Sequence, residues 1–336
     1  MKKVYIIAEA GVNHNGDVEL AKKLIVKAKE AGADCVKFQT YKTELIVTKT
    51  SPKANYQLNV TDPKESQFDM LKKLELGMEA YPELIELCNK IGIDFMSTPY
   101  TVQDADFLNS LGVIAFKIAS GQLVELPFLK HIAQMGKPII LSTGMGTMQE
   151  VKEAVDTIRS NGKGHLTVLQ CTTDYPSSID DANINAMLTM RDVLKVDIGY
   201  SDHVENNYAC YAAVALGAKM IEKHFTLDRT MPGPDHSSSL EIQEFEELVD
   251  GIRKIERSLG SPEKNPTPAE LKNITGMRRS IVAIETIRKG ELVSIEKIAF
   301  KRPLTGIPPK ELDKVVNKKA ACDIASDTQI SFDMIA

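Results

Sequence analysis

The chain alternates eight times between a short apolar run with β-strand character and a longer stretch with helical periodicity. The apolar runs cover residues 4–8, 35–38, 94–96, 115–118, 138–141, 166–169, 196–199 and 219–221. The helical stretches cover residues 18–31, 81–91, 102–111, 126–135, 148–160, 182–194, 206–216 and 242–259. Eight such repeats predict a (β/α)8 TIM barrel of the α/β class. An open doubly wound sheet is the alternative, but no GxGxxG turn follows the first apolar run.

The pattern changes after residue 259. The segment GSPEKNPTP has the composition of a linker, and Thr267 and Pro268 then mark the start of a short helix. Residues 287–298 and 324–335 share apolar positions and turn placement at an offset of 37, which suggests a compact pseudo-symmetric unit. We therefore predict a barrel domain over 1–260, a linker with a short helix over 261–279 and a small β-rich domain over 280–336.

Polar and ionisable side chains gather where the apolar runs end, whereas the starts of the runs stay apolar. The residues at these ends are Glu9, Lys37, Gln39, Ser97, Thr98, Lys117, Ser120, Ser142, Thr143, Cys171, Thr172, Thr173, Ser201, Asp202, His203, Lys223 and His224. Any one of them is as easily explained as a solvated or capping group. The carboxyl ends of barrel strands meet at one rim, where active sites of this fold are built. Eight polar clusters at that level predict an active site there.

The charged residues expected at this rim indicate which class of ligand would bind there. Lys37, Lys117 and Lys223 would bring cations, and the neighbouring hydroxyl groups would add donors. Together they suit a ligand that carries both a phosphate and a carboxylate. Glu9, at the end of the first run, is a candidate for acid–base chemistry.

Two histidines follow consecutive apolar runs that a helical pattern connects. In such a unit the strands are parallel, so His203 and His224 are expected side by side on the rim. Two neutral imidazoles at that place can hold a divalent cation. On the pair alone, two independent hydrogen-bonding histidines are the favoured interpretation, because no short motif such as HExxH supports the metal.

The composition of the chain indicates in which cellular compartment the protein works and which kinds of partner it has. A formal net charge of −5 argues against nucleic acid as the main partner, and no apolar run approaches the length of a membrane span. Glu9 interrupts the first apolar run too early for a signal peptide. Five scattered cysteines without CxxC spacing indicate reduced thiols. We expect a cytoplasmic protein.

Several motifs together are similar to those of one known family. They are EAGVNHNG at 9–16, VKFQT at 36–40, STP at 97–99, KIASG at 117–121, LSTGM at 141–145, GYSDH at 199–203, EKHFTLD at 222–228 and GPDH at 233–236. This combination resembles the sialic acid synthases. The C-terminal module, with KRPLTGIPP at 301–309, resembles their antifreeze-like (SAF) domain. The resemblance covers nearly the whole chain.

The resemblance implies a reaction between phosphoenolpyruvate and the open-chain form of an N-acetylated amino sugar. Carbon–carbon bond formation is followed by addition of water at C2 and release of phosphate with C–O cleavage. With N-acetylmannosamine the product would be N-acetylneuraminate. A divalent metal, Mn²⁺ or Mg²⁺, would sit on the histidines that match His203 and His224 and polarise the sugar aldehyde. The metal or Glu9 would assist the attacking water.

The resemblance also assigns ligand-binding residues and a quaternary structure. Phosphoenolpyruvate ligands would be Lys37, Thr98, Lys117, Ser120, Ser142 and Ser201. Sugar-binding positions would be Gln39, Tyr175 and Asp235. Arg302 matches an arginine that the antifreeze-like domain of one subunit places over the barrel of the other. That match implies a domain-swapped homodimer.

Two departures from the family pattern concern the sugar. Gln122 stands where relatives carry an acidic residue that contacts the sugar, and CTTDYP at 171–176 replaces a motif in which sialic acid synthases present asparagine. An alternative acceptor is therefore a 6-deoxy-diacetamido sugar, which would give N,N'-diacetyllegionaminate. Two further classes stay open. They are a Schiff-base aldolase or lyase that uses Lys117 or Lys223, and a non-catalytic protein that binds through its C-terminal module.

Overall fold

The computed structural model describes residues 3–62 and 64–336, apart from the side chain of Asn59. The chain divides into two compact units, Met1–Gly260 and Ser261–Ala336, and each is described by itself. Among the described residues, we find no helix with the length and apolar character needed to cross a membrane.

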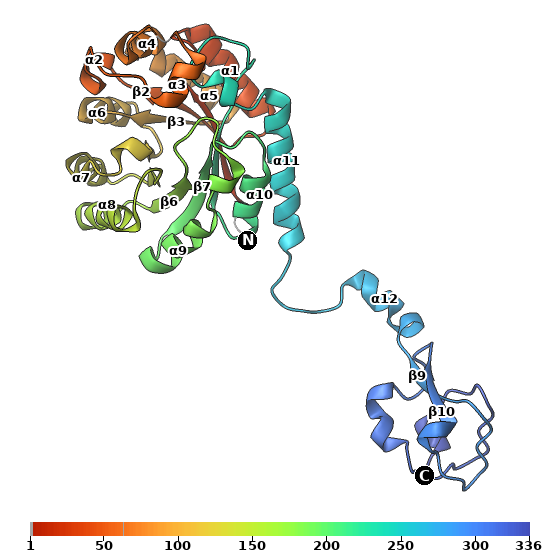
Figure 1. Cartoon of the computed structure of the whole chain (residues 1–336). Helices are drawn as coiled ribbons and strands as arrows, with labels where there is room; N and C mark the ends of the chain where they lie inside the picture. Colours follow the sequence, from red (N-terminus) through yellow and green to blue (C-terminus); the bar gives the residue numbers. More distant parts are fainter. Residues whose placement is uncertain (1–2, 63) are drawn as a thin grey trace. The chain divides into compact units, whose positions relative to one another are not determined.

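The first unit is a nearly closed barrel of eight parallel strands (Figure 1). The strands are β1 (Tyr5–Gly11), β2 (Cys35–Thr40), β3 (Asp94–Pro99), β4 (Phe116–Ile118), β5 (Ile139–Ser142), β6 (Leu166–Cys171), β7 (Asp197–Asp202) and β8 (Met220–His224). Their hydrogen-bonded order is β3-β2-β1-β8-β7-β6-β5-β4, so β1 joins the first and last repeats. The predicted (β/α)8 barrel is confirmed.

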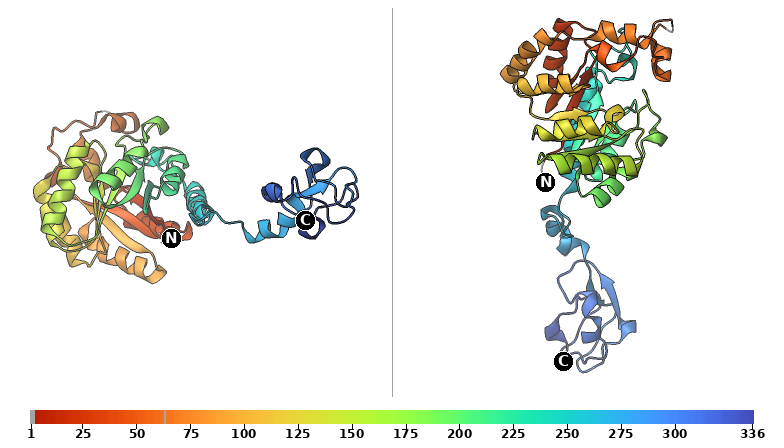
Figure 2. Two further views of the ribbon diagram at one scale, coloured as in Figure 1. Left: turned by 90° about the horizontal axis from the view of Figure 1, so that it is seen from below. Right: turned by 90° about the vertical axis from the view of Figure 1, so that its left-hand side faces the viewer.

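Helices cover the outside of this barrel (Figure 2). They are α1 (Val18–Glu30), α5 (Tyr81–Ile91), α6 (Val102–Ser110), α7 (Leu126–Gln134), α8 (Met148–Asn161), α9 (Asn185–Leu194), α10 (Tyr208–Ala215) and α11 (Ile242–Leu259). One large apolar cluster fills the space between helices and strands. A smaller cluster inside the barrel contains Ile7, Cys35, Met96, Ala115, Ile140 and Leu169. The interior is therefore packed, as is usual for this architecture.

Capping residues and left-handed backbone positions explain where several helices begin. They also explain why one helix starts later than predicted. Thr147 caps α8 by accepting a hydrogen bond from the Glu150 backbone, and the Glu150 side chain accepts one from the Thr147 backbone, which completes a capping box. The helix predicted from 182 begins at Asn185, because Asn183 has a left-handed φ of 44°. Glu241 is the residue that precedes α11, and the 3-10 turn His236–Ser238 lies just before it.

The long connection between β2 and α5 has secondary structure of its own. It contains α2 (Thr43–Ile46), α3 (Asn55–Val60), α4 (Gln67–Leu74) and the 3-10 turn Met78–Ala80. Val12, Tyr41, Met70 and Leu74 form a small apolar cluster that holds the connection against the loop after β1. Ser66 caps α4 by accepting a hydrogen bond from the Asp69 backbone. The connection therefore lies at the carboxyl ends of the strands.

The second unit is small and rich in turns. It contains α12 (Pro268–Met277), the antiparallel pair β9 (Ser280–Ala283) and β10 (Ile298–Lys301), and the 3-10 turns Ile295–Lys297, Pro309–Lys314 and Phe332–Met334. Thr267 caps α12, as its position before Pro268 suggests. Ten buried apolar residues form the core of this unit.

The repeat suggested by the sequence is present in the second unit. Ile287 and Ile324, 37 residues apart, pair with each other, and each backbone N–H donates to the carbonyl of the other at 2.8 Å. Gly290 and Asp327 occupy equivalent turn positions with φ of 83° and 64°. The turns Ile295–Lys297 and Phe332–Met334 are equivalent too. The predicted pseudo-symmetry is confirmed.

Candidate active site

The barrel brings most of the candidate residues together at the carboxyl ends of its strands. Glu9 lies on β1, Lys37 and Gln39 on β2, Thr98 on β3, Lys117 on β4, Ser142 on β5, Ser201 on β7 and His224 on β8. Ser120 and Gln122 form the 3-10 turn after β4, Tyr175 follows β6, His203 directly follows β7 and Asp235 precedes the turn His236–Ser238. Strand pairing places Glu9 beside Lys37 on one side and His224 on the other.

Two lysines and two carboxylates form a buried cluster in this end of the barrel. Lys37 Nζ lies 2.7 Å from Glu9 Oε2 and 3.8 Å from Glu222 Oε2. Lys117 Nζ lies 3.3 Å from Glu222 Oε1, which also accepts a hydrogen bond from Ser201 Oγ at 3.0 Å. All four side chains are at most 5% exposed. Buried charges of this kind persist only when they are paired or bind a ligand.

The two carboxyl groups of this cluster have different pKa values. Burial raises the pKa of Glu9 to about 7, although Lys37 opposes this effect. Burial also acts on Glu222, but Lys117 and Lys37 hold its pKa below the usual value. Glu9 can therefore gain or lose a proton near neutral pH, while Glu222 stays ionised. That division of roles is typical of acid–base sites.

Hydroxyl groups surround the two lysines. Thr98 Oγ1 accepts a hydrogen bond from Lys37 Nζ at 3.1 Å, and Ser120 Oγ accepts one from the backbone N–H of Gly144 at 3.0 Å. A Cβ atom on Gly144 would lie only 2.1 Å from Thr173 Oγ1, so glycine is required for this close approach. The buried oxygens of Ser142 and Thr173 have no hydrogen-bond partner. These donors are available to an anion bound beside the lysines.

The two candidate metal ligands face each other. The ring centroids of His203 and His224 are 5.4 Å apart. His203 Nδ1 lies 2.6 Å from the carbonyl oxygen of Thr172, a contact that suits a protonated Nδ1 and leaves Nε2 free. His224 Nδ1 is buried without a partner. Burial, reinforced by His203, keeps the pKa of His224 well below its usual value, so this ring is neutral.

The donor set fits a divalent cation in part. Burial opposes protonation of His203, but the Cys171 thiol and the Thr172 carbonyl raise its pKa overall, and a bound dication would reverse that effect. Among the described residues, no group of three or more histidine, cysteine or acidic side chains has the arrangement of a metal site. Two imidazoles would therefore leave the remaining coordination positions to water or substrate.

A cavity of about 250 Å³ opens beside the histidines. Its walls include Gln39, Tyr175, His224 and Asp235, three of which are candidate sugar-binding residues. Tyr175 packs on His203 with ring centroids 4.0 Å apart. Burial raises the pKa of Asp235 to about 6, although His203 opposes the shift.

The other two candidate sugar residues lie apart from this cavity wall. Gln122 is buried, donates from Nε2 to the Tyr100 carbonyl at 3.1 Å, and leaves Oε1 without a partner. Arg302 belongs to the second unit, where it is exposed and its Nε donates to the Met277 carbonyl at 3.0 Å. The sugar-binding role of both stays a prediction.

Lys223 does not reach the site, contrary to the expectation of a rim cation. It lies between Glu222 and His224 on β8, and alternation along a strand turns it to the opposite face. Its Nζ is 2.5 Å from Asp202 Oδ2 and also contacts the carbonyls of Val204 and Asn206. A Schiff base at Lys223 would require this buried network to be broken.

Sequence reasoning missed several residues of the site. Glu222 is one of them: it lies on the same strand face as His224, which period-two alternation along β8 indicates. Cys171 Sγ lies 3.9 Å from His203 Nδ1, and Tyr56 of α3 stacks on Tyr175 with centroids 4.7 Å apart. No local pattern marks Tyr56, because the contact joins residues far apart in the chain.

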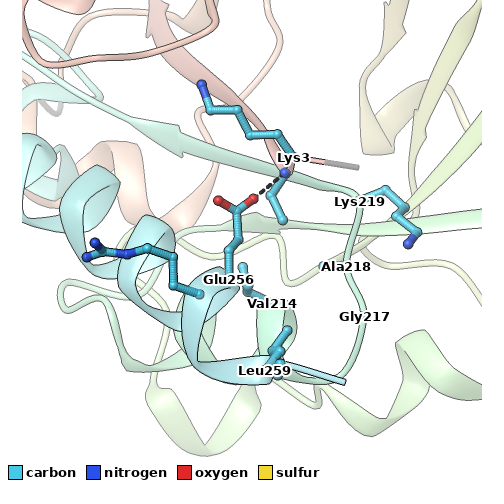
Figure 3. Close-up of a pocket in the computed structure, with 10 residues that line it drawn as sticks. Lys3, Val214, Gly217, Ala218, Lys219, Glu256 and Leu259 are labelled. Atoms are coloured by element: carbon cyan, nitrogen blue, oxygen red, sulfur yellow. Dashed lines mark hydrogen bonds between the residues drawn. The ribbon is translucent and has the colours of Figure 1, made fainter. Parts of the chain in front are cut away.

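A second cavity lies at the amino ends of the strands, at the other end of the barrel (Figure 3). Its volume is about 310 Å³, and its walls include Lys3, Lys219, Glu256 and Leu259. Glu256 accepts a hydrogen bond from the Val4 backbone. None of the candidate site residues lines this cavity, so it is separate from the site described above.

Comparisons with known proteins agree with this architecture. The model of the NeuB family matches residues 24–264, and that of the SAF domain matches residues 278–336. The N,N'-diacetyllegionaminic acid synthase of Campylobacter jejuni is 46% identical over 98% of this chain and 99% of its own length. The enzyme of the same name from Legionella pneumophila is 44% identical over 98% of this chain and 94% of its own length.

A solved structure extends the comparison. The crystal structure of N-acetylneuraminic acid (sialic acid) synthetase from Leptospira borgpetersenii, in complex with citrate, matches with a TM-score of 0.73 and 34% identity. The match covers 81% of this chain and 90% of that chain. With a family model that spans most of the barrel and relatives identical at more than four positions in ten, the chain belongs to the NeuB family and carries a C-terminal SAF domain.

Proposed function

We propose that the chain is a nonulosonic acid synthase that condenses phosphoenolpyruvate with an N-acetylated amino sugar and releases phosphate. The observation that carries the proposal is the buried cluster of Lys37, Lys117, Glu9 and Glu222, with unpartnered hydroxyls beside it, in a barrel of the NeuB family. A small anion with a phosphate and a carboxylate fits these donors.

Phosphoenolpyruvate would bind at the lysine cluster. Its negative charges would compete with Glu9 for Lys37. Lys37 would then turn to the ligand and leave Glu9 as a carboxylate, and Lys117, beside Glu222, would supply a second cation. Thr98, Ser120, Ser142 and Ser201 would donate further hydrogen bonds to the phosphate or carboxylate.

The sugar would bind with its aldehyde near His203 and His224. A Mn²⁺ or Mg²⁺ ion on these histidines would act as a Lewis acid toward the aldehyde, and imidazole ligands favour Mn²⁺ of the two. Attack by C3 of phosphoenolpyruvate forms the new carbon–carbon bond and leaves C2 electron-deficient. Water adds to C2 and gives one proton to Glu9, and the former aldehyde oxygen takes up a proton to become a hydroxyl. The C2–O bond to phosphate then breaks as the new C2 hydroxyl becomes the ketone and its proton leaves with phosphate.

The acceptor sugar is proposed from the relatives and from the departures at the sugar site. The two enzymes with 46% and 44% identity are named for N,N'-diacetyllegionaminic acid, whereas the sialic acid synthetase is 34% identical. We therefore favour a 6-deoxy-diacetamido sugar over N-acetylmannosamine. Gln122, a neutral amide where an acidic residue was expected, is compatible with that change of acceptor.

One assay tests the reaction and the acceptor. Purified enzyme with Mn²⁺ should release phosphate from phosphoenolpyruvate only when an acetamido sugar is present, with higher kcat/KM for the diacetamido sugar than for N-acetylmannosamine. Phosphoenolpyruvate labelled with ¹⁸O in the bridging position should deliver the label to phosphate. Labelled product instead would contradict C–O cleavage, and no release with any sugar would refute the proposed reaction.

Two alternatives are separated by simple experiments. A Schiff-base aldolase would form a lysine adduct with pyruvate that borohydride traps, and the proposed synthase forms none. A non-catalytic binding protein would release no phosphate from phosphoenolpyruvate. We also propose a cytoplasmic setting, because all five cysteines are unpaired thiols.

Arg302 provides a test of the proposed domain-swapped homodimer. Its planar guanidinium suits an acetamido carbonyl or sugar hydroxyls, and the side chain is exposed on the second unit. We expect Arg302→Ala to impair use of the sugar and leave binding of phosphoenolpyruvate nearly intact. Mixing Arg302→Ala with His203→Ala under subunit exchange should restore part of the activity, because one of the two sites in a mixed dimer has neither defect. No recovery, with exchange confirmed, would refute the shared site.

A further inference from the structure

The cavity beside the histidines continues into the long connection between β2 and α5. One side is formed by Gln39, Tyr175, His224 and Asp235 of the barrel. The other is formed by Tyr41, Ile46, Val47, Tyr56 and Leu71 of the connection, with Tyr100 beside them. The cavity therefore runs from the place where the aldehyde would react to a wall made by α2, α3 and α4, which Figure 1 shows at one edge of the barrel.

The chemistry of the two ends differs. Near the barrel the walls carry a carboxyl, an amide and an imidazole, whereas the connection contributes two tyrosine rings and three aliphatic side chains. Among the described residues that line the cavity there is no lysine or arginine. A phosphate at the far end of the sugar would have no cation to pair with, so a phosphorylated acceptor does not match this wall.

Two amides, Gln57 and Gln67, also line the far end. Gln57 is 7% exposed, and its Oε1 accepts from the Ala54 backbone at 3.0 Å and from Gln67 at 3.3 Å. Its Nε2 has only a long contact of 3.3 Å to the Tyr56 hydroxyl, so an N–H remains available. An apolar wall with one amide donor matches an acetamido group, whose methyl is apolar and whose carbonyl accepts.

We propose that the wall formed by Ile46, Val47, Tyr56 and Leu71 receives the distal part of the acceptor and selects its substituents. This inference rests on the proposed condensation. It further identifies the part of the cavity that determines which sugar is accepted. With the aldehyde held at the histidines, an open-chain sugar extends its distal carbons toward this wall. There a second acetamido group and a terminal methyl gain by burial. The hydroxyls of N-acetylmannosamine would lose water against the aliphatic side chains, which offer them no hydrogen bond.

Neighbouring residues on α2 give a matched pair of variants. Ile46 lines the cavity, whereas Leu45 is 58% exposed and does not line it. Ile46→Asn should lower the ratio of kcat/KM for the diacetamido sugar to that for N-acetylmannosamine by about ten-fold, the usual size of a lost apolar contact in a specificity pocket. Leu45→Asn should leave the ratio unchanged. Both variants should keep the wild-type KM for phosphoenolpyruvate and the wild-type Tm.

A second variant tests whether local unfolding of the connection, rather than loss of an apolar contact, causes the change in preference. Val47→Thr keeps the shape of the side chain and adds only a hydroxyl, and it should shift the same ratio in the same direction by a smaller factor. Wild-type preference for N-acetylmannosamine would refute the acceptor proposed above. If wild type prefers the diacetamido sugar but Ile46→Asn and Val47→Thr leave that preference unchanged, the reaction stands and this wall does not select the sugar.

Discussion

The two ends of the barrel differ in how completely their polar side chains are hydrogen-bonded. At the amino ends, Arg253 donates to the Val4 carbonyl and to Asp34, each at 2.8 Å. Asp34 also accepts from the Ile6 backbone, and Tyr5 donates to Asp94 at 2.6 Å. At the carboxyl ends, buried atoms of Gln122, Ser142, Thr173 and His224 have no partner. The difference indicates which end awaits a ligand.

The contrast extends to the other buried side-chain atoms without a partner among the described residues, apart from the Glu9 and Glu222 oxygens that face Lys37. Each belongs to a residue that ends a strand or lies in the connection or first helical turn after one: Asn13, His14, Thr43, Asp104, Gln122, Ser142, Thr173, Ser177, Asn207 and His224. Native proteins satisfy nearly all such groups, so a concentration of exceptions marks a site rather than a defect. The amino ends supply stability, and the carboxyl ends give up some stability for binding.

The largest expected effect is the loss of turnover when a histidine at the carboxyl end of the barrel is replaced, compared with a histidine at the amino end. His203→Ala or His224→Ala should cut turnover by about three orders of magnitude or more, since each removes one of only two candidate ligands. Titration calorimetry should show weakened Mn²⁺ binding in both variants. His165→Ala, at the amino end of β6 and 63% exposed, should retain wild-type activity and metal affinity. Full activity of His203→Ala in metal-free buffer would contradict the assignment.

The next effect concerns stability rather than chemistry. Lys223→Met leaves the buried carboxylate of Asp202 without its cation, which should cost about 3–5 kcal/mol of unfolding free energy in urea titrations. Lys219→Met, an exposed lysine beside the cavity of Figure 3, should change stability by less than about 0.5 kcal/mol. A stable but inactive Lys223→Met enzyme would instead support a catalytic lysine.

The case of Lys223 shows how far the sequence could predict this molecule. The fold followed from eight β/α alternations, and the level of the site followed from the polar residues that end the strands. Which strand-end residues face the barrel interior depends on alternation and register, and here Glu222 and not Lys223 faces inward. Applying period-two alternation to β8 would have assigned both correctly.

Other features of the site could not be inferred from any local pattern. The raised pKa of Glu9 comes from complete burial and from the neighbouring Glu222, against the opposing effect of Lys37 and Lys117, so it is a property of four strands together. Tyr56 reaches Tyr175 across more than a hundred residues of chain, and its role in the cavity depends on how α3 packs.

The pH dependence of stability tests the buried carboxyl at the carboxyl end. The pKa of Glu9 is raised from 4.5 to about 7, so between these values the folded protein holds a proton that the unfolded chain has released. Stability from this group is therefore complete below pH 4.5 and falls as pH rises through 7. The difference between wild type and Glu9→Gln should change by on the order of 3 kcal/mol from pH 4.5 to 8. Parallel stability curves would show that burial does not raise the pKa.

The smallest expected effect compares lysines of the two ends as anion binders. Lys37→Met and Lys117→Met keep most of the aliphatic stem but remove a buried charge that faces the proposed phosphoenolpyruvate site. Loss of one charge-assisted hydrogen bond should weaken phosphoenolpyruvate binding by about 1.5–3 kcal/mol, roughly ten- to a hundred-fold in KM. The KM of the sugar should change much less.

Lys219→Met provides the matched control for these variants. Lys219 also lies beside a cavity, but its charge is exposed at the amino ends, where solvent screening leaves little energy to lose. It should bind both substrates as wild type does. Equal weakening of both substrates in Lys37→Met and Lys117→Met would mean that the lysines support the site as a whole. A strong effect of Lys219→Met on phosphoenolpyruvate would move the anion site to the other end of the barrel and remove the distinction between the two ends.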